Sequence, residues 1–205
     1  MLGYGAIAFI VLAVSILTLD LSAVGSLTED AFYKLVKANP DMKFERTAFG
    51  ELIIVSPTGG ETGNQNFELY IDLGIWNRQQ NLGKAFDSST CFKLPNGANR
   101  SPDVAWVTLE KWESLTPPQR QKFPPLAPDF VVELRSTTDD LETLQAKMQE
   151  YINNGVRLGW LIDPQNQQVE IYRQGQAVEV RKSPTTLLGE DVLPGFVLDL
   201  RRILF

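Results

Sequence analysis

Two segments of the chain place carboxylates at the ends of strongly apolar strand patterns. In the first, Pro102-Asp103 precedes Val104-Ala-Trp-Val107, and in the second, Pro128-Asp129 precedes Phe130-Val-Val-Glu133. Consecutive apolar residues are typical of a strand buried on both faces, where an ionised carboxylate is costly unless it is paired or binds a metal. Glu133 is therefore the strongest single indication of a functional site. The alternative is a glutamate at the solvent end of its strand.

Asp103 is better placed than Asp129 to share a metal ion with Glu133. Asp129 lies four residues before Glu133 on one strand, hence about 13 Å away at roughly 3.3 Å per residue. Ligand distances of about 2.0–2.6 Å cannot bridge that gap. Asp103 belongs to another strand, and neighbouring strands at about 4.8 Å would bring both carboxylates to one ion. We therefore predict Asp103 and Glu133 as metal ligands and Asp129 as a turn residue.

The residue types that are missing narrow the chemistry further. The chain has no histidine and one cysteine, Cys91. Ser-His-Asp and Cys-His relays, imidazole-bound zinc and an intramolecular disulfide are thereby excluded. A metal held by oxygen ligands alone is a hard cation, with Mg²⁺ or Mn²⁺ as the leading candidates. One cysteine also fits a reducing compartment, and we expect a cytoplasmic protein.

The overall charge counts against a general nucleic-acid binder. The net charge is −6 and the isoelectric point about 4.8, whereas phosphate contacts need a basic surface. A local basic patch is the alternative to scattered, solvated charges. Its candidates are Arg78, Lys84, Lys93, Arg100, Lys147 and Arg157.

The elements that must position these residues follow an α/β pattern of a length suited to one domain. Apolar periodicity predicts helices over 26–38, 64–80 and 139–154, with a short helix opening the proline-rich loop 111–128. The predicted strands are 42–46, 51–55, 84–88, 90–94, 103–107, 129–134, 158–162, 169–172, 177–181 and 196–200. We expect a mixed central sheet flanked by helices, with an N-terminal β-hairpin and a C-terminal β extension. Ser26 and Glu29 resemble a capping box, and Asn154-Gly155 a helix C-cap.

The N-terminus differs from the rest of the chain. Residues 2–19 carry no charge and are just long enough to span a bilayer, but no Lys or Arg precedes them as in a signal peptide. We expect residues 1–16 to be an apolar extension that packs on the domain or on a partner, and 17–205 to form a single domain. A membrane anchor within residues 1–19 is the alternative.

Several motifs together resemble the Uma-type family of restriction endonucleases. They are Pro102-Asp103, Glu133-Leu-Arg135-Ser136, Lys147 and Tyr151 in a helix ending Asn153-Asn-Gly155-Val156, and Leu158-Gly-Trp160-Leu-Ile-Asp163-Pro164. The resemblance covers about residues 17–205. That family belongs to the PD-(D/E)XK superfamily. The resemblance therefore implies a restriction-endonuclease-like fold, carboxylates that bind a metal, and a lysine that orients or activates the attacking water.

This lysine does not stand two residues after the glutamate, where the chain has Arg135. Arginine can clamp phosphate but is a poor proton acceptor. Lys147 is the candidate instead, because it lies roughly 40° beyond the Tyr151 edge of the helix's apolar arc, with its head free to turn toward Glu133. Gln145, at the other edge, is a second candidate. A solvated helix lysine is the alternative for Lys147.

Two more positions follow from the resemblance. Many relatives have a histidine at the start of the first long helix, where this chain has Asn64, so hydrogen bonding to substrate would replace proton exchange there. Glu45 resembles the family's Tyr-Glu and is a further candidate metal ligand. A cross-strand charge near Arg46 is its alternative.

We therefore expect a Mg²⁺-dependent endonuclease that hydrolyses DNA phosphodiester bonds as a homodimer. Asp103 and Glu133 would hold the ion, Lys147 would position water and Arg135 would neutralise the phosphate. The other class is a catalytically weak nuclease-fold module that binds nucleic acid or protein, tethered to a membrane through its N-terminus.

Overall fold

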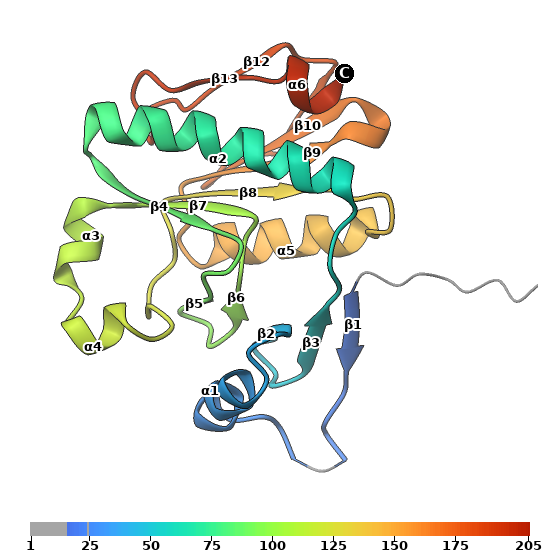
Figure 1. Ribbon diagram of the computed structural model, residues 1–205, viewed down its shortest axis with the longest axis vertical. Helices are drawn as coiled ribbons and strands as arrows, with labels where there is room; N and C mark the ends of the chain where they lie inside the picture. Colours follow the sequence, from blue (N-terminus) through green and yellow to red (C-terminus); the bar gives the residue numbers. More distant parts are fainter. Residues whose placement is uncertain (1–15, 24) are drawn as a thin grey trace, which may run out of the picture.

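The computed structural model describes residues 16–23 and 25–205 (Figure 1). The assignment of residues 1–15 as an extension or an anchor lies outside these residues. The end of the apolar stretch is a strand, β1 (Ile16–Leu19), which pairs antiparallel with β3 (Leu52–Val55). No helix in the described part of the chain is long and apolar enough to cross a bilayer.

A six-stranded mixed sheet forms the centre of the molecule. Its strands are β4 (Gly83–Asp87), β7 (Val104–Thr108), β8 (Phe130–Leu134), β9 (Leu158–Asp163), β10 (Gln168–Arg173) and β11 (Glu179–Lys182). Their order is β11-β10-β9-β8-β7-β4, with β8 and β9 parallel and the other neighbours antiparallel. Every residue of β8 is buried, as its unbroken apolar run predicts for an inner strand.

Two long helices cover the two faces of this sheet (Figure 1). α2 (Gly60–Gln80) packs on one face through Leu69, Leu73 and Trp76. α5 (Leu141–Asn153) packs on the other and forms the crossover that a parallel β8–β9 pair requires. Asp140 caps the start of α5, and Asn154 ends it ahead of Gly155, whose φ of +102° favours glycine. The predicted C-cap is thus confirmed.

A second, smaller sheet lies beside the central one. It contains β1, β3, β2 (Lys43–Arg46), β5 (Phe92–Lys93) and β6 (Asn99–Arg100), in the order β1-β3-β2-β6-β5. β2 and β3 form the predicted hairpin. In Figure 1, β5 and β6 extend from the central sheet toward β2. After β6, in the small sheet, the chain continues into β7 of the central sheet.

Some boundaries differ from the predictions. The first helix, α1 (Glu29–Ala38), is capped by Thr28, whose hydroxyl accepts from Ala31 N at 3.3 Å, so the predicted cap at Ser26 is wrong. α2 begins at Gly60, not at Asn64. The remaining elements are α3 (Leu109–Ser114), α4 (Pro117–Arg120), a 3₁₀ turn (Pro164–Asn166), β12 (Thr186–Leu188), β13 (Val197–Asp199) and α6 (Arg201–Leu204). β1, β6 and β12 were not predicted as strands. β6 and β12 have only two or three residues, too few for an alternating pattern to be recognised.

Gly83, at the start of β4, leaves no space for a side chain. A Cβ there would lie 2.3 Å from Val107 O and 2.4 Å from Trp106 ring atoms. We expect Gly83→Ala to lower the free energy of unfolding by about 1–3 kcal/mol, since a backbone carbonyl cannot move aside. Gly63→Ala is the control, because its Cβ would meet nothing within 4 Å. It should raise stability by about 0.5–1 kcal/mol. Urea unfolding of both variants tests this, and similar effects would contradict it.

Candidate active site

β7 and β8 bring Asp103 and Glu133 together. Val104 pairs with Val132 in the antiparallel register, so the next step of the ladder sets Asp103 opposite Glu133. Opposed residues of antiparallel strands point to the same face of the sheet. Leu134 N donates to Asp103 Oδ2 at 2.9 Å and holds the aspartate there. Glu133 is buried and Asp103 half-buried, so two carboxylates lie side by side with little solvent to screen them.

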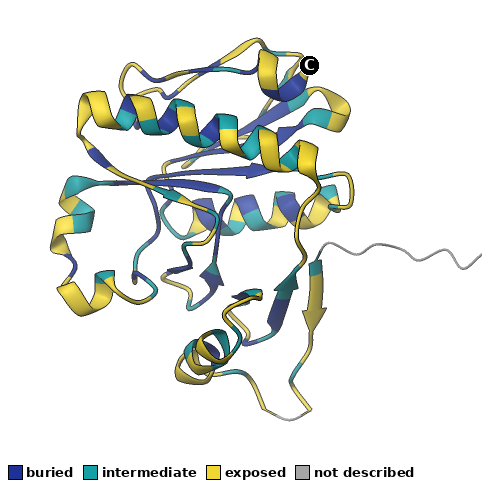
Figure 2. Ribbon diagram, in the orientation of Figure 1, coloured by how far each residue is buried: buried dark blue, intermediate teal, exposed yellow. Residues whose placement is uncertain are grey.

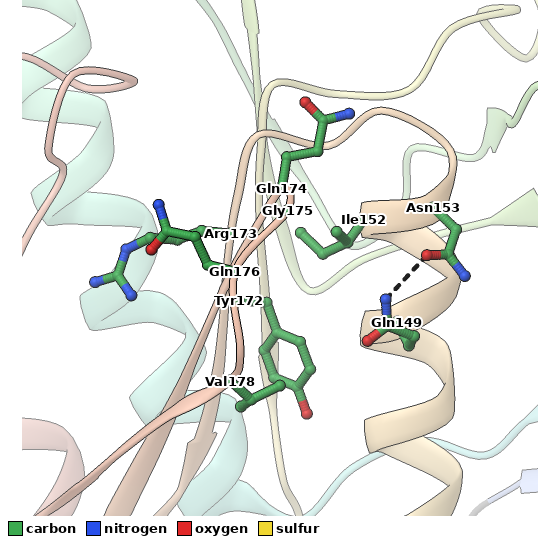
Figure 3. A pocket seen from close by; sticks show the side chains of 9 residues that line it. All are labelled: Gln149, Ile152, Asn153, Tyr172, Arg173, Gln174, Gly175, Gln176 and Val178. Carbon is green, nitrogen blue, oxygen red and sulfur yellow. Dashed lines mark hydrogen bonds between the residues drawn. The ribbon is translucent and has the colours of Figure 1, made fainter.

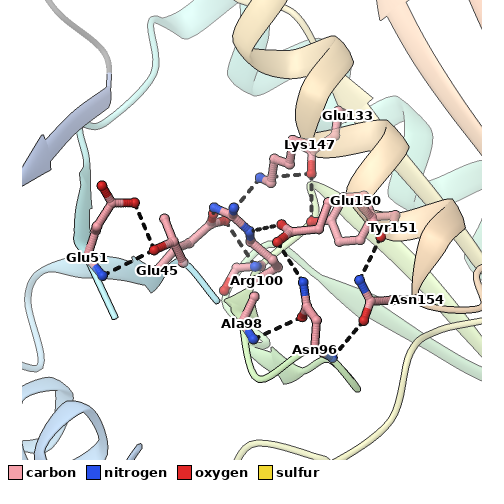
Figure 4. A network of polar contacts seen from close by, with 12 residues as sticks. Glu45, Glu51, Asn96, Ala98, Arg100, Glu133, Lys147, Glu150, Tyr151 and Asn154 are labelled. Atoms are coloured by element: carbon pink, nitrogen blue, oxygen red, sulfur yellow. Dashed lines mark hydrogen bonds and ion pairs between the residues drawn. The ribbon is translucent and has the colours of Figure 1, made fainter. Parts of the chain in front are cut away.

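α5 supplies a cation and a hydroxyl to this pair (Figure 4). Lys147 Nζ lies 2.9 Å from Glu133 Oε1, and Tyr151 OH donates to the same oxygen at 3.0 Å. Lys147 and Tyr151 are four residues apart and therefore neighbours on one side of the helix. The apolar arc of α5 packs against the sheet, which lays Lys147 at its border against Glu133.

The small sheet adds Glu45. Lys147 Nζ lies 3.0 Å from Glu45 Oε1, which also accepts from Ser101 N at 3.0 Å. Arg100 Nη1 lies 3.2 Å from Glu45 Oε2, and Arg100 Nε lies 2.5 Å from Glu150 Oε2 on α5. Figure 4 shows Lys147 between Glu133 and Glu45. One ammonium group therefore bridges carboxylates from the two sheets.

The alternative reading of Glu45, an ordinary charge beside Arg46, does not describe its contacts. Arg46 turns away and donates from Nε to Asn99 Oδ1 at 3.0 Å. Its Nη1 donates to Leu27 O at 2.9 Å. Glu45 instead belongs to the Lys147 cluster.

Burial and local charge separate the acidities of the carboxylates. Burial raises the pKa of Glu133 to about 7; Lys147 opposes this shift, and Asp103 adds to it. Burial also raises the pKa of Asp103. Burial alone would raise the pKa of Glu45, but the charges of Lys147 and Arg100 outweigh burial and lower this pKa to about 2.

The lysine itself stays charged. Burial would lower the pKa of Lys147, but the adjacent Glu133 and Glu45 raise it above its usual range. Near neutral pH the cluster thus holds the Lys147 ammonium group, an ionised Glu45, and a Glu133 whose pKa is close to the solution pH. Paired groups with contrasting pKa values are typical of functional sites.

Asp103 and Glu133 together fit a divalent cation. The hydrogen bonds and ion pairs formed by the described residues engage Asp103 Oδ2 and Glu133 Oε1, which leaves one oxygen of each for a ligand. No three or more acidic or cysteine side chains group into a metal cage within the described ranges. Mg²⁺ needs no such cage, because it is usually held by one or two carboxylates and completed by water and substrate phosphate.

The three predicted substrate-binding residues lie outside this cluster. Arg135 Nη1 pairs with Asp163 Oδ2 at 2.9 Å, and Gln145 Nε2 donates to Glu170 Oε1 at 2.7 Å, on β10. Asn64 is exposed on α2, across the sheet from α5. The structure therefore gathers Asp103, Glu133, Lys147 and Glu45 but brings none of these three into contact with them.

Arg100 and Glu150 complete the network, and no sequence pattern singled out either as a site residue. Arg100 stands on the two-residue strand β6, and Glu150 has the spacing of an ordinary helix charge. Among the other basic-patch candidates, Lys93 pairs with Glu29 and Arg157 with Asp191. That part of the patch is dispersed in separate ion pairs.

A hollow of about 420 Å³ lies elsewhere, between α5 and the β10–β11 hairpin (Figure 3). Four of the residues that line it carry amide side chains: Gln149, Asn153, Gln174 and Gln176. Gln149 Nε2 donates to Asn153 Oδ1 at 2.9 Å. No carboxylate and none of the predicted site residues is among the residues that line this hollow.

The raised pKa of Glu133 links stability to pH. The folded protein binds this proton more tightly than the unfolded chain, so the stabilisation is complete below about pH 4.5 and is lost by about pH 7. Glu133→Gln removes the titration. In EDTA, we expect wild-type stability to fall relative to the variant across that window, by more than about 1 kcal/mol. Urea unfolding at several pH values measures the difference, and parallel profiles would contradict the assignment.

The chain was compared with known proteins. The profile of the Uma2 family, described as "Putative restriction endonuclease", matches residues 29–201. The fold is similar to that of a crystal structure described as "a putative nuclease belonging to DUF820 from Anabaena variabilis ATCC 29413". The TM-score is 0.71 and the identity 21%, over 87% of this chain and 97% of that chain, a likeness that concerns the fold alone. None of the curated proteins compared with the chain matches it.

The family match includes both strands and the helix that carry Asp103, Glu133 and Lys147. It agrees with the resemblance carried by the Pro-Asp, Glu-Leu-Arg and helix motifs, over nearly the same residues. The restriction-endonuclease-like architecture expected from those motifs is likewise the one observed. The chain therefore belongs to the Uma2 family.

Proposed function

We propose that this protein is a divalent-metal-dependent endonuclease that hydrolyses DNA phosphodiester bonds. One observation carries the proposal: Lys147 Nζ lies 2.9 Å from Glu133 Oε1, on the strand beside Asp103. A partly buried Asp-Glu-Lys set at the ends of β7 and β8 suits a cation, a phosphate and a water molecule. Membership of a family described as restriction endonucleases supports nuclease chemistry over other hydrolyses.

Asp103 and Glu133 are the proposed ligands of Mg²⁺ or Mn²⁺. A bound ion of this kind polarises the phosphoryl oxygen and lowers the pKa of water. Glu45 is the weaker candidate ligand, because Lys147 and Ser101 N engage its Oε1 and Arg100 engages its Oε2. We assign Glu45 mainly to orienting Lys147.

Lys147 is proposed to orient the attacking water and to stabilise charge on the phosphate. Its raised pKa keeps it protonated near neutral pH, so it can donate hydrogen bonds but cannot accept a proton there. Of the two roles implied by the family resemblance, orientation therefore fits better than activation.

Substrate contacts by Arg135, Gln145 and Asn64 also belong to the proposal. Arg135 and Gln145 already donate to Asp163 and Glu170, so they would contact phosphate only with their remaining N–H groups. Asn64 is exposed, and its side chain forms no such hydrogen bond with a described residue. We further propose a cytoplasmic homodimer, since a two-fold arrangement lets two sites cut two strands.

A binding module without turnover is the second candidate. The net charge of −6 and the full engagement of Lys147 by two carboxylates favour it. In that case the nuclease fold would hold nucleic acid or protein without cleaving it. No cleavage of duplex, flap or single-stranded substrates, together with no calorimetric Mn²⁺ binding, would assign the protein to this class.

The purified protein should cut or nick DNA with Mg²⁺ or Mn²⁺, and Glu133→Gln should abolish this activity. Gln is nearly isosteric with Glu but uncharged, so the variant loses the ion without a cavity. Several kcal/mol of metal catalysis correspond to a loss on the order of 10³-fold or more. Asp129→Asn is the matched control, a buried carboxylate at the other end of β8 that pairs with Lys111. Cleavage by Glu133→Gln at the wild-type rate would point to a contaminant.

Lys147→Met should reduce turnover far more than Mn²⁺ affinity, because the ammonium group is not a ligand of the ion. Loss of a nearby positive charge should leave calorimetric Mn²⁺ binding unchanged or tighter, while single-turnover cleavage falls about 10²-fold or more. Lys111→Met is the control, since Lys111 pairs with Asp129 at the other end of β8. Equal losses of binding and turnover would assign Lys147 to the metal site instead.

A further inference from the structure

The cations of the Lys147 cluster are engaged by carboxylates of the protein itself. Lys147 lies between Glu133 and Glu45, and Arg100 lies between Glu45 and Glu150. A phosphodiester brings a negative charge of its own, and these cations can pair with it only at the expense of their present partners. Phosphate contacts supply much of the affinity of a protein for DNA. A cation at the same place that no carboxylate holds would therefore be the more effective phosphate ligand.

Lys43 is such a cation. It is the first residue of β2 and is half-buried, whereas the other three residues of this strand are buried (Figure 2). Alternate residues of a strand point to the same face, so Lys43 shares with Glu45 the face that meets Lys147. Phe44 takes the opposite face and packs into the core beside α1. No ion pair or hydrogen bond joins Lys43 Nζ to another residue that the structure describes.

Two observations place the Lys43 ammonium group near Asp103. Glu45 accepts from Ser101 N at 3.0 Å, and the segments that carry these two residues run antiparallel. Two residues further along these segments, in opposite directions, stand Lys43 and Asp103, which therefore come alongside each other. The electrostatics agree with this placement. Burial raises the pKa of Asp103, and the charge of Lys43 is the largest opposing effect, ahead of that of Lys147.

We propose that Lys43 binds a phosphate of the DNA substrate beside the metal ligand Asp103. This inference deepens the proposed function and rests on it. The ammonium group offers three donors to phosphate oxygens, and the contact requires no ion pair of the protein to break. Lys147 contacts Glu133 and Lys43 stands beside Asp103, so positive charge would lie at both ends of the carboxylate pair. A chain with a net charge of −6 needs such local positive charge to hold DNA.

The salt dependence of DNA binding tests this contact. Fluorescence anisotropy with a short labelled duplex is measured at several salt concentrations, with Ca²⁺ in place of Mg²⁺ to slow cleavage. Lys43→Met should weaken binding about tenfold at low salt and reduce the slope of log affinity against log salt by about 0.9, the share of one phosphate contact. Lys43→Arg keeps the charge and should keep the wild-type slope. Lys182→Met is the matched control, because Lys182 is exposed on β11 and forms no ion pair with a described residue. It should bind as the wild type does, and circular dichroism should show all variants folded.

Cleavage kinetics with Mg²⁺ separate substrate binding from chemistry. Lys43→Met should raise the DNA concentration at half-maximal rate and change the maximal rate little, unlike Lys147→Met. A wild-type salt slope in Lys43→Met, or a change in its Mn²⁺ affinity alone, would overturn the proposal and leave the nuclease function standing. A reduced slope in a protein that cleaves no DNA would contradict the proposed function alone. A wild type that binds no duplex would overturn both.

Discussion

The Lys147 ammonium group is shared between carboxylates of two different sheets, and the surrounding fold is arranged around that contact. Glu133 comes from the buried strand β8 and Glu45 from the small sheet, and each lies about one hydrogen-bond length from Nζ. Buried charges are tolerated only when they are paired and hydrogen-bonded, so removing one member leaves the others uncompensated. The cluster thus fixes the position of α5 relative to both sheets. Arg100 and Glu150 strengthen this connection from the other side of Glu45.

The same contact divides the carboxylates by acidity. Glu45 contacts two cations and accepts a hydrogen bond from a backbone N–H, so it stays ionised, whereas Glu133, next to Asp103, holds its proton up to about pH 7. Without a metal, ionising both Glu133 and Asp103 would set two like charges side by side in a site with little solvent. A divalent cation would relieve this repulsion without rearranging the strands, because each residue keeps one oxygen uncommitted. The fold therefore holds the two carboxylates in positions that are electrostatically unfavourable without a ligand, as is common in functional sites.

The two helices differ in what they do for this arrangement. α5 has one apolar face, and the residues at its border, Lys147 and Gln145, are held by carboxylates of β8 and β10, on either side of β9. α2 is apolar on two sides and contributes no described contact to the cluster. Its inner side closes the core, and its outer side is exposed.

Much of the site could be predicted from sequence, because burial and side-chain direction follow local periodicity. The apolar runs after Asp103 and before Glu133 indicated neighbouring inner strands, and the wheel of α5 placed Lys147 beside Glu133. Pairings between distant segments had no such signal. Glu45 lies 102 residues from Lys147, yet contacts it in preference to Arg46 next door. The partner of Arg135 was likewise decided by which strand ends meet, and that of Gln145 by which strand α5 packs on. Local pattern determined which residues are buried and which way they point, whereas only the packing of the two sheets determined which charges share an ion pair.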